Sequence, residues 1–486
     1  MKLKDILRDV EIADLQADLE LEIAGVSCDS RKTKPGDLFV AVKGYESDGH
    51  RFIGKAVEKG AVCVLCEDVP EDGIAYVRVE NTRLGLAAVS ANFLGRPAEQ
   101  LKVVGVTGTS GKTTTTTLIR ELIEAVTGEM CGLIGTNVNI VGGVETEASR
   151  TTPESIEVQQ LLRDMVDAGC KYAVMEVSSH ALCLNRVYGI PFEAAVYTNL
   201  SLDHLDFHGT MEEYAKAKAL LFRQAKHGSV NRDDKYASVM LENALCPMMT
   251  YSANDNEADL VAKDIRLTAG GVRFIAVSDE GLDTVKLAIP GRFSVYNALS
   301  ALSALKMLGI PVAAAAEALA RCKGVKGRAE VVPTGTDYTV LIDYAHKPDA
   351  LENILSTIRE CAEGRVVTLF GCGGDRDRTK RPVMGEIAAR YSDFVVVTSD
   401  NPRTEDPMEI IGEILPGLKG TKTPYKVIEN RRQAIRWAME NAKPGDTIVL
   451  AGKGQETYQE IGHEKFHLDE REVVAEVLAD TAKSCR

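Results

Sequence analysis

The segment VVGVTGTSGKTTTTT, residues 103–117, restricts the fold of this chain more than any other part of the sequence. An apolar run leads into glycines at 105, 108 and 111, and Lys112 and Thr113 then open a stretch in which apolar residues recur at helical spacing. Glycines allow backbone N–H groups to turn toward phosphate oxygens, and a helix N-terminus adds partial positive charge. The segment therefore predicts a strand, a phosphate-binding loop and a helix, in that order.

The side chains of this loop suit ATP. Lys112 can reach the β and γ phosphates, and Thr113 can ligate Mg²⁺. The common pattern G-x-x-x-x-G-K-[ST] has glycine where this chain has Val106, and a glycine stands one residue earlier. The strand expected at residues 102–106 and the helix that Gly128 can end support nucleotide binding despite this departure. The loop alone selects no reaction, because kinases, transport ATPases and ligases all use one.

Composition and charge argue against several classes of protein. The chain has 486 residues and a formal net charge of −14, so it has no basic excess to neutralise the phosphates of nucleic acid. The N-terminus lacks the apolar core of a signal peptide, and no run of about 18 apolar residues predicts a membrane span. The eleven cysteines are scattered, and Cys63 and Cys66 lie in an apolar run that indicates a strand. We therefore expect buried free thiols and a cytoplasmic protein.

The sequence divides into three segments that differ in their expected pattern of strands and helices. Residues 1–98 predict a small α/β domain, and residues 99–328 predict a central domain of the P-loop ATPase type with a mostly parallel sheet. Residues 329–486 alternate strand and helix most clearly and predict a Rossmann-like doubly wound α/β domain. The expected strands of the second and third segments include residues 172–177, 194–198, 339–342, 366–370, 394–398, 425–428 and 447–450.

Polar residues follow two of the expected central strands. Glu176 ends the first, at a position where an acid commonly holds Mg²⁺ beside a phosphate loop. His180 follows it, and His204 and His208 follow the second, so three of the eight histidines come after strand ends of one sheet. Surface histidines would rarely be placed so, and the pattern favours a site at this edge.

Several motifs, in order over essentially the whole chain, resemble the Mur ligases of peptidoglycan synthesis. They are VVGVTGTSGKTTTT, EVSSHAL, TNLSLDHLDFHG, the lysine in EEYAKAKALLF, PGRFSVYNALSA and DYAHKPDAL. DSRKTKPGDLFVAVKG and DNPRTEDP resemble the branch that adds meso-2,6-diaminopimelate to UDP-N-acetylmuramoyl-L-alanyl-D-glutamate. The resemblance implies that ATP phosphorylates a D-glutamate carboxylate and that the incoming amine attacks the acyl phosphate. It implies small-molecule substrates, no nucleic acid and a monomer.

The resemblance also assigns roles at the nucleotide. The implied catalytic residues are Lys112, Glu176, His204 and Lys218, and the implied magnesium residues are Thr113, Glu176 and His204. Lys218 matches a lysine that CO₂ converts to a carbamate (N6-carboxylysine), although its spacing alone is typical of an ordinary helix-surface lysine. The implied ATP contacts are Gly108, Thr109, Ser110, Gly111, Lys112, Thr113, Thr114, Asn297, Arg328, Asp343 and His346.

Two further sets of residues are implied for the other substrates. The UDP-sugar dipeptide would contact Cys28, Ser30, Tyr45, Glu46, Ser47, Thr151, Thr152, Ser178, Arg186 and Lys218. Leu184 stands where some relatives have glutamine and is left out. Diaminopimelate would contact Arg376, Asp400, Asn401, Pro402, Arg403, Gly452 and Glu456.

The identity of the incoming amino acid rests on chemistry, which favours diaminopimelate. It differs from lysine by a second carboxylate at its far end, which a guanidinium such as that of Arg403 can clamp with two hydrogen bonds. The alternatives are ligation of L-lysine on the same fold, a folylpolyglutamate-synthase-like ligase, and a transport or regulatory ATPase. A folylpolyglutamate-synthase-like ligase fits the first segment and DNPR poorly. A transport or regulatory ATPase leaves DYAHKPDA and the third segment unexplained.

Overall fold

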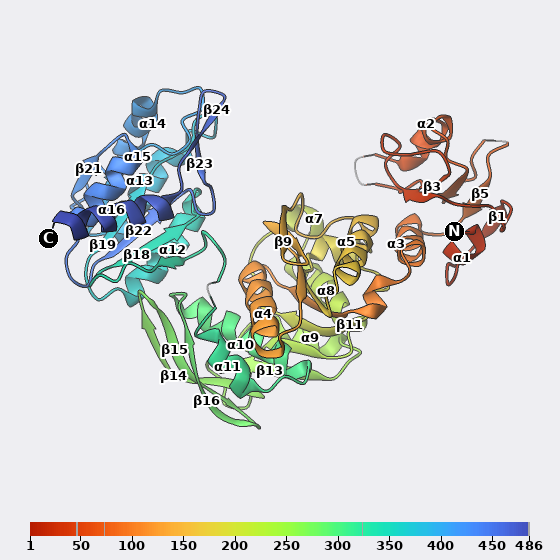
Figure 1. Ribbon diagram of the computed structural model, residues 1–486, viewed down its shortest axis with the longest axis horizontal. Coiled ribbons are helices and arrows are strands. Elements are labelled where there is room, and N and C mark those ends of the chain that lie inside the picture. Colours follow the sequence, from red (N-terminus) through yellow and green to blue (C-terminus); the bar gives the residue numbers. More distant parts are fainter. Residues whose placement is uncertain (45–46, 72, 323, 485–486) are drawn as a thin grey trace. The chain divides into compact units, whose positions relative to one another are not determined.

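The computed structural model describes residues 1–44, 47–71, 73–322 and 324–484 (Figure 1). The chain divides into two compact units. The first comprises Met1–Val261, Val277–Gly281 and Asn297–Ala318, and the second comprises Ala262–Ala276, Leu282–Tyr296 and Leu319–Arg486. The three domain ranges expected from the sequence, with boundaries after residues 98 and 328, remain a prediction.

The N-terminal part of the first unit is a small α/β layer. Its sheet has the order β1-β5-β4-β3-β2, with β1 antiparallel to β5 and the other pairs parallel. Cys63 and Cys66 on β4 are buried free thiols, as expected. The elements are α1 (Leu3–Ile6), β1 (Asp14–Gln16), β2 (Gly25–Ser27), β3 (Asp37–Val40), α2 (Ile53–Glu58), β4 (Cys63–Cys66), β5 (Tyr76–Arg78) and α3 (Thr82–Phe93).

The central sheet has the order β16-β15-β14-β13-β12-β11-β6-β10-β7-β8-β9 among the described residues. The pairs from β13 to β7 are parallel, which confirms the expected parallel sheet, whereas β8 and β9 add antiparallel strands. Its strands are β6 (Lys102–Thr107), β7 (Cys131–Ile134), β8 (Val138–Val141), β9 (Val144–Glu147), β10 (Tyr172–Glu176), β11 (Phe192–Tyr197), β12 (Gly228–Asn231), β13 (Met248–Ser252), β14 (Leu260–Thr268), β15 (Gly271–Ser278) and β16 (Gly281–Leu287).

Helices follow the strands of this part in the expected alternation. The helix α4 after the phosphate loop ends at Gly128, whose φ of +73° suits glycine at a helix end. Its buried face is formed by Leu118, Ile119, Leu122 and Ile123, at the spacing seen in the sequence. The helices are α4 (Lys112–Thr127), α5 (Ser155–Asp167), α6 (Ser179–Cys183), α7 (Leu205–His208), α8 (Met211–Ala219), α9 (Ala237–Asn243), α10 (Arg292–Met307) and α11 (Val312–Leu319).

The C-terminal sheet has the order β17-β18-β22-β19-β20-β21 and is parallel apart from β17. Every strand expected from the third segment is present, which confirms the doubly wound α/β arrangement. The elements are β17 (Glu330–Val332), β18 (Thr339–Asp343), α12 (Pro348–Cys361), β19 (Val366–Phe370), α13 (Lys380–Tyr391), β20 (Phe394–Val397), α14 (Pro407–Ile414), β21 (Tyr425–Val427), α15 (Arg431–Glu440), β22 (Thr447–Ala451), β23 (Tyr458–Ile461), β24 (Glu464–His467) and α16 (Glu470–Ser484).

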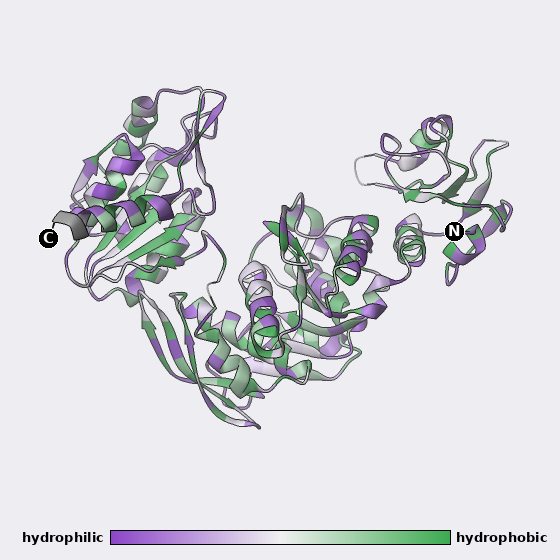
Figure 2. Cartoon of the chain, in the orientation of Figure 1, coloured by the Kyte–Doolittle hydropathy of each residue, from purple (hydrophilic) through white to green (hydrophobic). Residues whose placement is uncertain are grey.

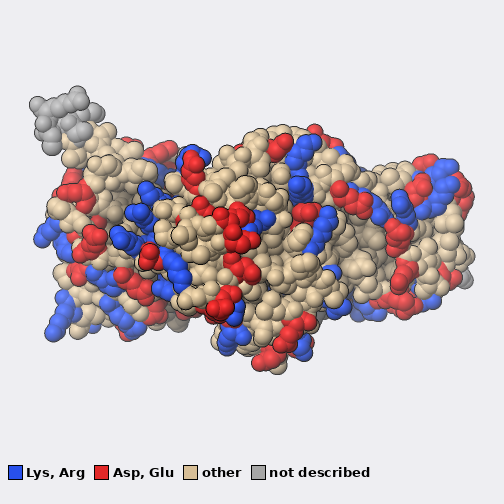
Figure 3. Space-filling view, turned by 90° about the horizontal axis from the view of Figure 1, so that it is seen from below, with Lys and Arg blue, Asp and Glu red and all other residues tan. Residues whose placement is uncertain are grey.

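Burial follows this layering. Figure 2 shows mostly hydrophobic residues along the strands of the C-terminal sheet, and mixed hydrophobic and hydrophilic residues on the helices. Acidic and basic side chains intermingle on the face displayed in Figure 3. Within the described parts of the chain, we find no helix that combines the length and the apolar character needed to cross a membrane.

Parallel pairing determines where polar residues gather. Glu176 at the end of β10 pairs in register with Val106 on β6, and Tyr197 at the end of β11 pairs with Thr107. The segments that follow these three strands therefore emerge at one edge of the central sheet. The same holds in the second unit, where Asp343 at the end of β18 pairs with Ala451 at the end of β22.

Candidate functional site

The loop after β6 is held against the segment that follows β11. The N–H of Thr109 donates to the Asn199 carbonyl at 2.9 Å, and the Thr198 hydroxyl donates to the Ser110 carbonyl at 2.7 Å. Gly108 has a φ of +153°, and a Cβ at this position would lie 1.9 Å from Thr198 Oγ1. Only glycine fits there, so the close approach of the two segments depends on it.

Two lysines, a partly buried one and a fully buried one, meet at one carbonyl oxygen of this loop. Lys112 Nζ and Lys218 Nζ each donate to the Gly108 carbonyl at 2.9 Å, and Lys112 also donates to the Thr109 carbonyl at 3.0 Å. Lys218 is 1% exposed, so its interpretation as an ordinary helix-surface lysine is wrong. Lys216, two residues earlier on α8, is about 60% exposed, but position 218 faces the loop, and helical spacing alone could not reveal this.

The electrostatics of this lysine pair are unusual. Burial lowers the pKa of Lys218 well below its usual range, and the charge of Lys112 lowers it further. Burial also lowers the pKa of Lys112, while Glu176 and Asp203 act in the opposite direction. Two ammonium groups this close repel each other in a medium that screens them poorly, so the neutral amine form of Lys218 is favoured.

Two acids act electrostatically on these lysines: Glu176, which was expected at a strand end, and Asp203, which was not. Glu176 is 1% exposed, and its two carboxylate oxygens accept from the Thr136 N–H at 2.8 Å and the Thr136 hydroxyl at 2.9 Å. Asp203 lies 3.4 Å from His204 Nε2, measured from its Oδ2. His204 is about half exposed and has a φ of +51°, an uncommon conformation that occurs at functional sites.

The three histidines that follow the strand ends lie together. The ring centroids of His180 and His204 are 4.9 Å apart, and those of His180 and His208 are 5.5 Å apart. His208 stacks on Tyr214 at 4.7 Å, and its Nε2 lies 2.9 Å from the Ser179 hydroxyl. The cluster therefore packs against α8, the helix that carries Lys218.

His208 is expected to make folding sensitive to mild acid. Burial and the charges of His180, Lys218 and His204 lower its pKa from 6.5 to about 4, opposed by Asp206. Between these values the unfolded chain binds a proton that the folded chain does not, so stability falls as the pH decreases. In the absence of Mg²⁺, the loss of thermal midpoint between about pH 7.5 and about pH 5 should be smaller in His208→Gln than in the unaltered protein. Equal losses would show that His208 does not titrate in this way.

Residues expected for the sugar-peptide surround the same strand end. The Thr152 hydroxyl donates to the Glu176 carbonyl at 2.8 Å and accepts from the Ser178 N–H at 3.1 Å. Arg186 Nη1 donates to the Thr152 carbonyl at 3.2 Å, and the Thr151 hydroxyl accepts from Thr136 at 3.1 Å. The structure thus brings Thr151, Thr152, Ser178 and Arg186 together beside Glu176.

The residues expected at the uridine end lie in the N-terminal part. Ser30 is buried and Ser47 is exposed, whereas Tyr45 and Glu46 lie outside the described residues. Burial is the main cause that raises the pKa of the Cys28 thiol to about 11, with a contribution from the Glu154 carboxylate. Cys28 therefore lies within electrostatic reach of the central part.

Glu154 connects the two parts of this unit. It pairs with Arg186 at 2.6 Å, with Arg150 at 3.1 Å and, more loosely, with Arg83 of α3 at 3.8 Å. Of these three pairs, the one with Arg83, which joins the N-terminal part to the central part, is the longest and therefore the weakest.

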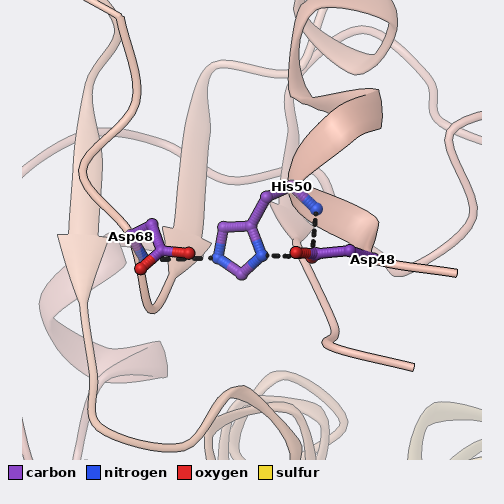
Figure 4. Close-up of side chains that lie close together, drawn as sticks. All are labelled: Asp48, His50 and Asp68. Carbon is purple, nitrogen blue, oxygen red and sulfur yellow. Dashed lines mark hydrogen bonds and ion pairs between the residues drawn. The ribbon is translucent and has the colours of Figure 1, made fainter. Parts of the chain in front are cut away.

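Among the described residues, one group has its potential ligand atoms as close together as a metal site requires, but its hydrogen bonds give it another role. Asp48, His50 and Asp68 lie together in the N-terminal part (Figure 4). His50 Nε2 accepts from the N–H groups of Glu67 and Asp68, at 2.9 and 3.3 Å, and Nδ1 lies 2.6 Å from Asp48 Oδ1. Both ring nitrogens are engaged, so His50 ties the segment before α2 to the end of β4.

The other residues expected to contact the nucleotide, outside the phosphate loop, belong partly to the first unit and partly to the second. Asn297 lies in the first unit, where its Oδ1 accepts from the Thr115 hydroxyl of α4 at 3.4 Å. Arg328 and His346 lie in the second unit, and both contact the ring of Tyr344: the Arg328 Cζ is 5.4 Å from the ring centroid, and the centroid of the His346 ring is 4.6 Å from it. Asp343 accepts from two backbone N–H groups, and burial raises its pKa.

The residues expected for diaminopimelate form a connected group in the second unit. Asn401 Nδ2 donates to Glu456 at 2.9 Å, and Asn401 Oδ1 accepts from Lys453 Nζ at 2.9 Å. Lys453 is fully buried and also donates to Glu456 at 3.0 Å. Asp400 is 7% exposed, and its Oδ2 has no hydrogen-bond partner among the described residues. A Cβ at Gly452 would lie 2.7 Å from that oxygen.

Arg403 is held at the edge of this group. Its Nε pairs with Glu460 at 2.9 Å and its Nη1 donates to the Gly374 carbonyl at 2.9 Å. Its backbone has a φ of +50°. Its N–H donates to the Glu460 carbonyl of β23, and its carbonyl accepts from the N–H of Gly462, which follows that strand. A guanidinium has five N–H groups, so further donors remain for a ligand. Pro402 is buried beside it, and Arg376 is exposed, with Nη1 donating to the Asp375 carbonyl at 3.2 Å.

Sequence reasoning missed several residues that this geometry includes. Thr136 donates to both oxygens of Glu176, Tyr344 contacts both Arg328 and His346, and Lys453 joins Asn401 to Glu456. The only available signal was the position of Lys453 within AGKGQETYQ, beside two residues that were selected.

Comparisons with known proteins agree with this arrangement. Three family models match in order: "Mur ligase family, catalytic domain" at residues 22–93, "Mur ligase middle domain" at 106–305 and "Mur ligase, glutamate ligase domain" at 327–454. The UDP-N-acetylmuramoyl-L-alanyl-D-glutamate--2,6-diaminopimelate ligase of Caldanaerobacter subterraneus subsp. tengcongensis is 47% identical over 99% of this chain and 100% of its own. The chain belongs to the Mur ligase family. A Clostridioides difficile Mur ligase with the same name is 43% identical, again over 99% and 100%.

Solved Mur ligase structures have the same fold. A structure of a UDP-N-acetylmuramoyl-L-alanyl-D-glutamate--2,6-diaminopimelate ligase has a TM-score of 0.79 and 34% identity, and the match covers 99% of each chain. A MurF structure from Acinetobacter baumannii has a TM-score of 0.60 at 19% identity and covers 98% of each chain, which supports the fold alone.

Proposed function

We propose that the protein is an ATP-dependent ligase that joins meso-2,6-diaminopimelate to UDP-N-acetylmuramoyl-L-alanyl-D-glutamate in peptidoglycan precursor synthesis. The observation that carries the proposal is the full-length likeness, at 43–47% identity, to Mur ligases named for that reaction. The loop lysines and the Arg403 group support it. That the enzyme is monomeric and cytoplasmic remains a prediction.

The reaction requires activation of a carboxylate. A carboxylate is a poor electrophile, so the γ-phosphoryl group of ATP is first transferred to the D-glutamate side chain, giving an acyl phosphate and ADP. The amine of diaminopimelate attacks the acyl carbon, and the tetrahedral intermediate releases phosphate as the amide forms. Charge develops on the transferred group, and Lys112, fixed by the carbonyls of Gly108 and Thr109, is the cation that faces it.

The residues around the loop suit Mg²⁺. Thr113 offers a hydroxyl and Glu176 a carboxylate, which are the oxygen donors that Mg²⁺ prefers, and His204 would complete the set through nitrogen or through water. When bound, the ion would neutralise the charge of the phosphates. Thr136 orients the carboxylate of Glu176 through two hydrogen bonds, and this fits a residue whose position matters.

Lys218 suits carbamylation. Reaction with CO₂ requires a neutral amine, and burial beside Lys112 favours that form. The product carries a negative charge, which would replace repulsion of Lys112 with attraction and would face the phosphate-bound cation. We therefore retain Lys218 as a carbamylated residue in the proposal.

An assay of coupled ADP release tests the reaction class. With UDP-N-acetylmuramoyl-dipeptide, diaminopimelate and Mg²⁺, we expect one ADP for each amide formed and only background ADP release when either the dipeptide or the amino acid is omitted. Equal ADP release without the amino acid would instead support a transport or regulatory ATPase. Turnover of a folate substrate would support the folylpolyglutamate-synthase-like alternative.

A further inference from the structure

Arg381 is a fully buried arginine that donates hydrogen bonds to the two loops carrying the proposed diaminopimelate arginines, Arg376 and Arg403. It lies on α13, and its Nη1 and Nη2 donate in parallel to the two carboxylate oxygens of Glu405, at 2.9 and 2.8 Å. Nη1 also donates to Glu413 of α14 at 2.7 Å, and Nη2 to the Gly373 carbonyl at 3.3 Å. One guanidinium thus binds the loop after β19, the loop after β20 and the helix that follows it.

Glu405 transmits this constraint to the neighbouring loop. Its Oε1 accepts from the N–H of Asp375 at 2.6 Å. The carboxylate of Asp375 in turn accepts from the Thr404 hydroxyl at 2.7 Å and the Thr404 N–H at 3.2 Å. Each loop thus contributes one carboxylate that accepts hydrogen bonds from the other loop: Glu405 from Asp375, and Asp375 from Thr404. Arg381 orients the carboxylate of Glu405. Arg381 also lowers the pKa of Glu405 to about 2, so this carboxylate is charged in the working pH range.

The two arginines proposed to bind diaminopimelate are sequence neighbours of the residues that make these hydrogen bonds. Arg376 follows Asp375 and Arg403 precedes Thr404 in the sequence. A Cβ at Gly373 would lie 3.0 Å from Arg403 Nη1 and 3.9 Å from Arg376 Cγ, so both side chains flank one glycine. The loops also touch closely, since a Cβ at Gly374 would lie 1.9 Å from the Pro402 carbonyl oxygen. A shift of either loop would therefore change the separation of the two guanidinium groups.

We propose that Arg381 is a positioning residue for recognition of the incoming amino acid, because its fork on Glu405 sets how Arg376 and Arg403 face the far carboxylate. The inference rests on the proposed function and extends it to a residue that touches no substrate. A fork of two parallel hydrogen bonds fixes orientation as well as distance, which a single ammonium contact does not.

Arg381→Lys tests this role, because lysine keeps the charge and loses the fork. We expect the KM for diaminopimelate to rise roughly tenfold, with the KM for ATP within about twofold of its original value. The preference for diaminopimelate over L-lysine, as a ratio of kcat/KM values, should fall by a similar factor, because lysine has no far carboxylate. A role in stability alone would lower the active fraction for both amino acids and leave that ratio unchanged.

Two further variants make the test decisive. Arg365→Lys alters another arginine that forms a fork in the same unit, on Asp446, and should leave both KM values and the ratio unchanged. Glu405→Gln keeps Arg381 and should reproduce the altered ratio, and it replaces Arg381→Lys if that variant does not fold. An unaltered ratio in a folded Arg381→Lys or Glu405→Gln variant would overturn the inference. Failure of the unaltered enzyme to ligate diaminopimelate would instead overturn the proposed function.

Discussion

Replacement of Lys218 with alanine is expected to lower kcat at least about a hundredfold, which is the scale of losing one charged group at a site of phosphoryl transfer. The side chain lies 2.9 Å from the Gly108 carbonyl, inside the phosphate loop, and the proposal gives it a negative charge in the active enzyme. Alanine removes both the contact and that charge. Initial rates at saturating substrates, with the thermal midpoint measured beside them, provide the test.

Lys216→Ala is the matched control. Lys216 lies two residues away on α8, is about 60% exposed, and pairs with Glu213 at the surface. Its removal should leave kcat within about twofold of the original value. Removal of CO₂ should also slow the unaltered enzyme, and bicarbonate should restore it. Turnover of Lys218→Ala near that of the unaltered enzyme, with CO₂ excluded, would show that no carbamate is needed.

Replacement of Arg403 with alanine is expected to raise the KM for diaminopimelate by roughly 30-fold or more, because loss of one partner of a hydrogen-bonded charge pair costs about 2–5 kcal/mol. The KM for ATP should change little, since Arg403 lies in the diaminopimelate group. Steady-state kinetics with each substrate varied in turn measures both values. Arg403→Lys should recover only part of the loss, because lysine keeps the charge without the planar fork.

Arg432→Ala controls for the loss of an arginine in the same unit. Arg432 lies on α15 at the surface, where it pairs with Glu476. Its removal should change neither KM. An unchanged KM for diaminopimelate in Arg403→Ala would refute the assignment of the clamp, even if ligation itself were retained.

The strands, the loop and the residues at strand ends could be predicted because they depend on local pattern. Apolar runs, helical spacing and glycine positions indicated β6, α4 and the C-terminal alternation, and parallel strands necessarily bring Glu176 and the segment with His204 to one edge. The sequence also placed Asp400 and Arg403 correctly after a strand, at the end of β20.

The burial of Lys218 and the role of Arg381 could not be predicted in this way. Both are charged residues on helices, where spacing alone indicates a solvated face, and both are buried because groups far away in sequence receive their hydrogen bonds. The Gly108 carbonyl lies 110 residues from Lys218, and Glu405 lies 24 residues from Arg381. Such partners follow from the tertiary arrangement, which no local pattern contains.

The most direct test of the proposed reaction is the mass of the product formed from UDP-N-acetylmuramoyl-L-alanyl-D-glutamate, ATP and Mg²⁺ with equal concentrations of meso-diaminopimelate and L-lysine. We predict a product whose mass exceeds that of the dipeptide substrate by one diaminopimelate residue, formed in large excess over any lysine adduct. A predominant lysine adduct, or consumption of ATP without either adduct, would contradict the account.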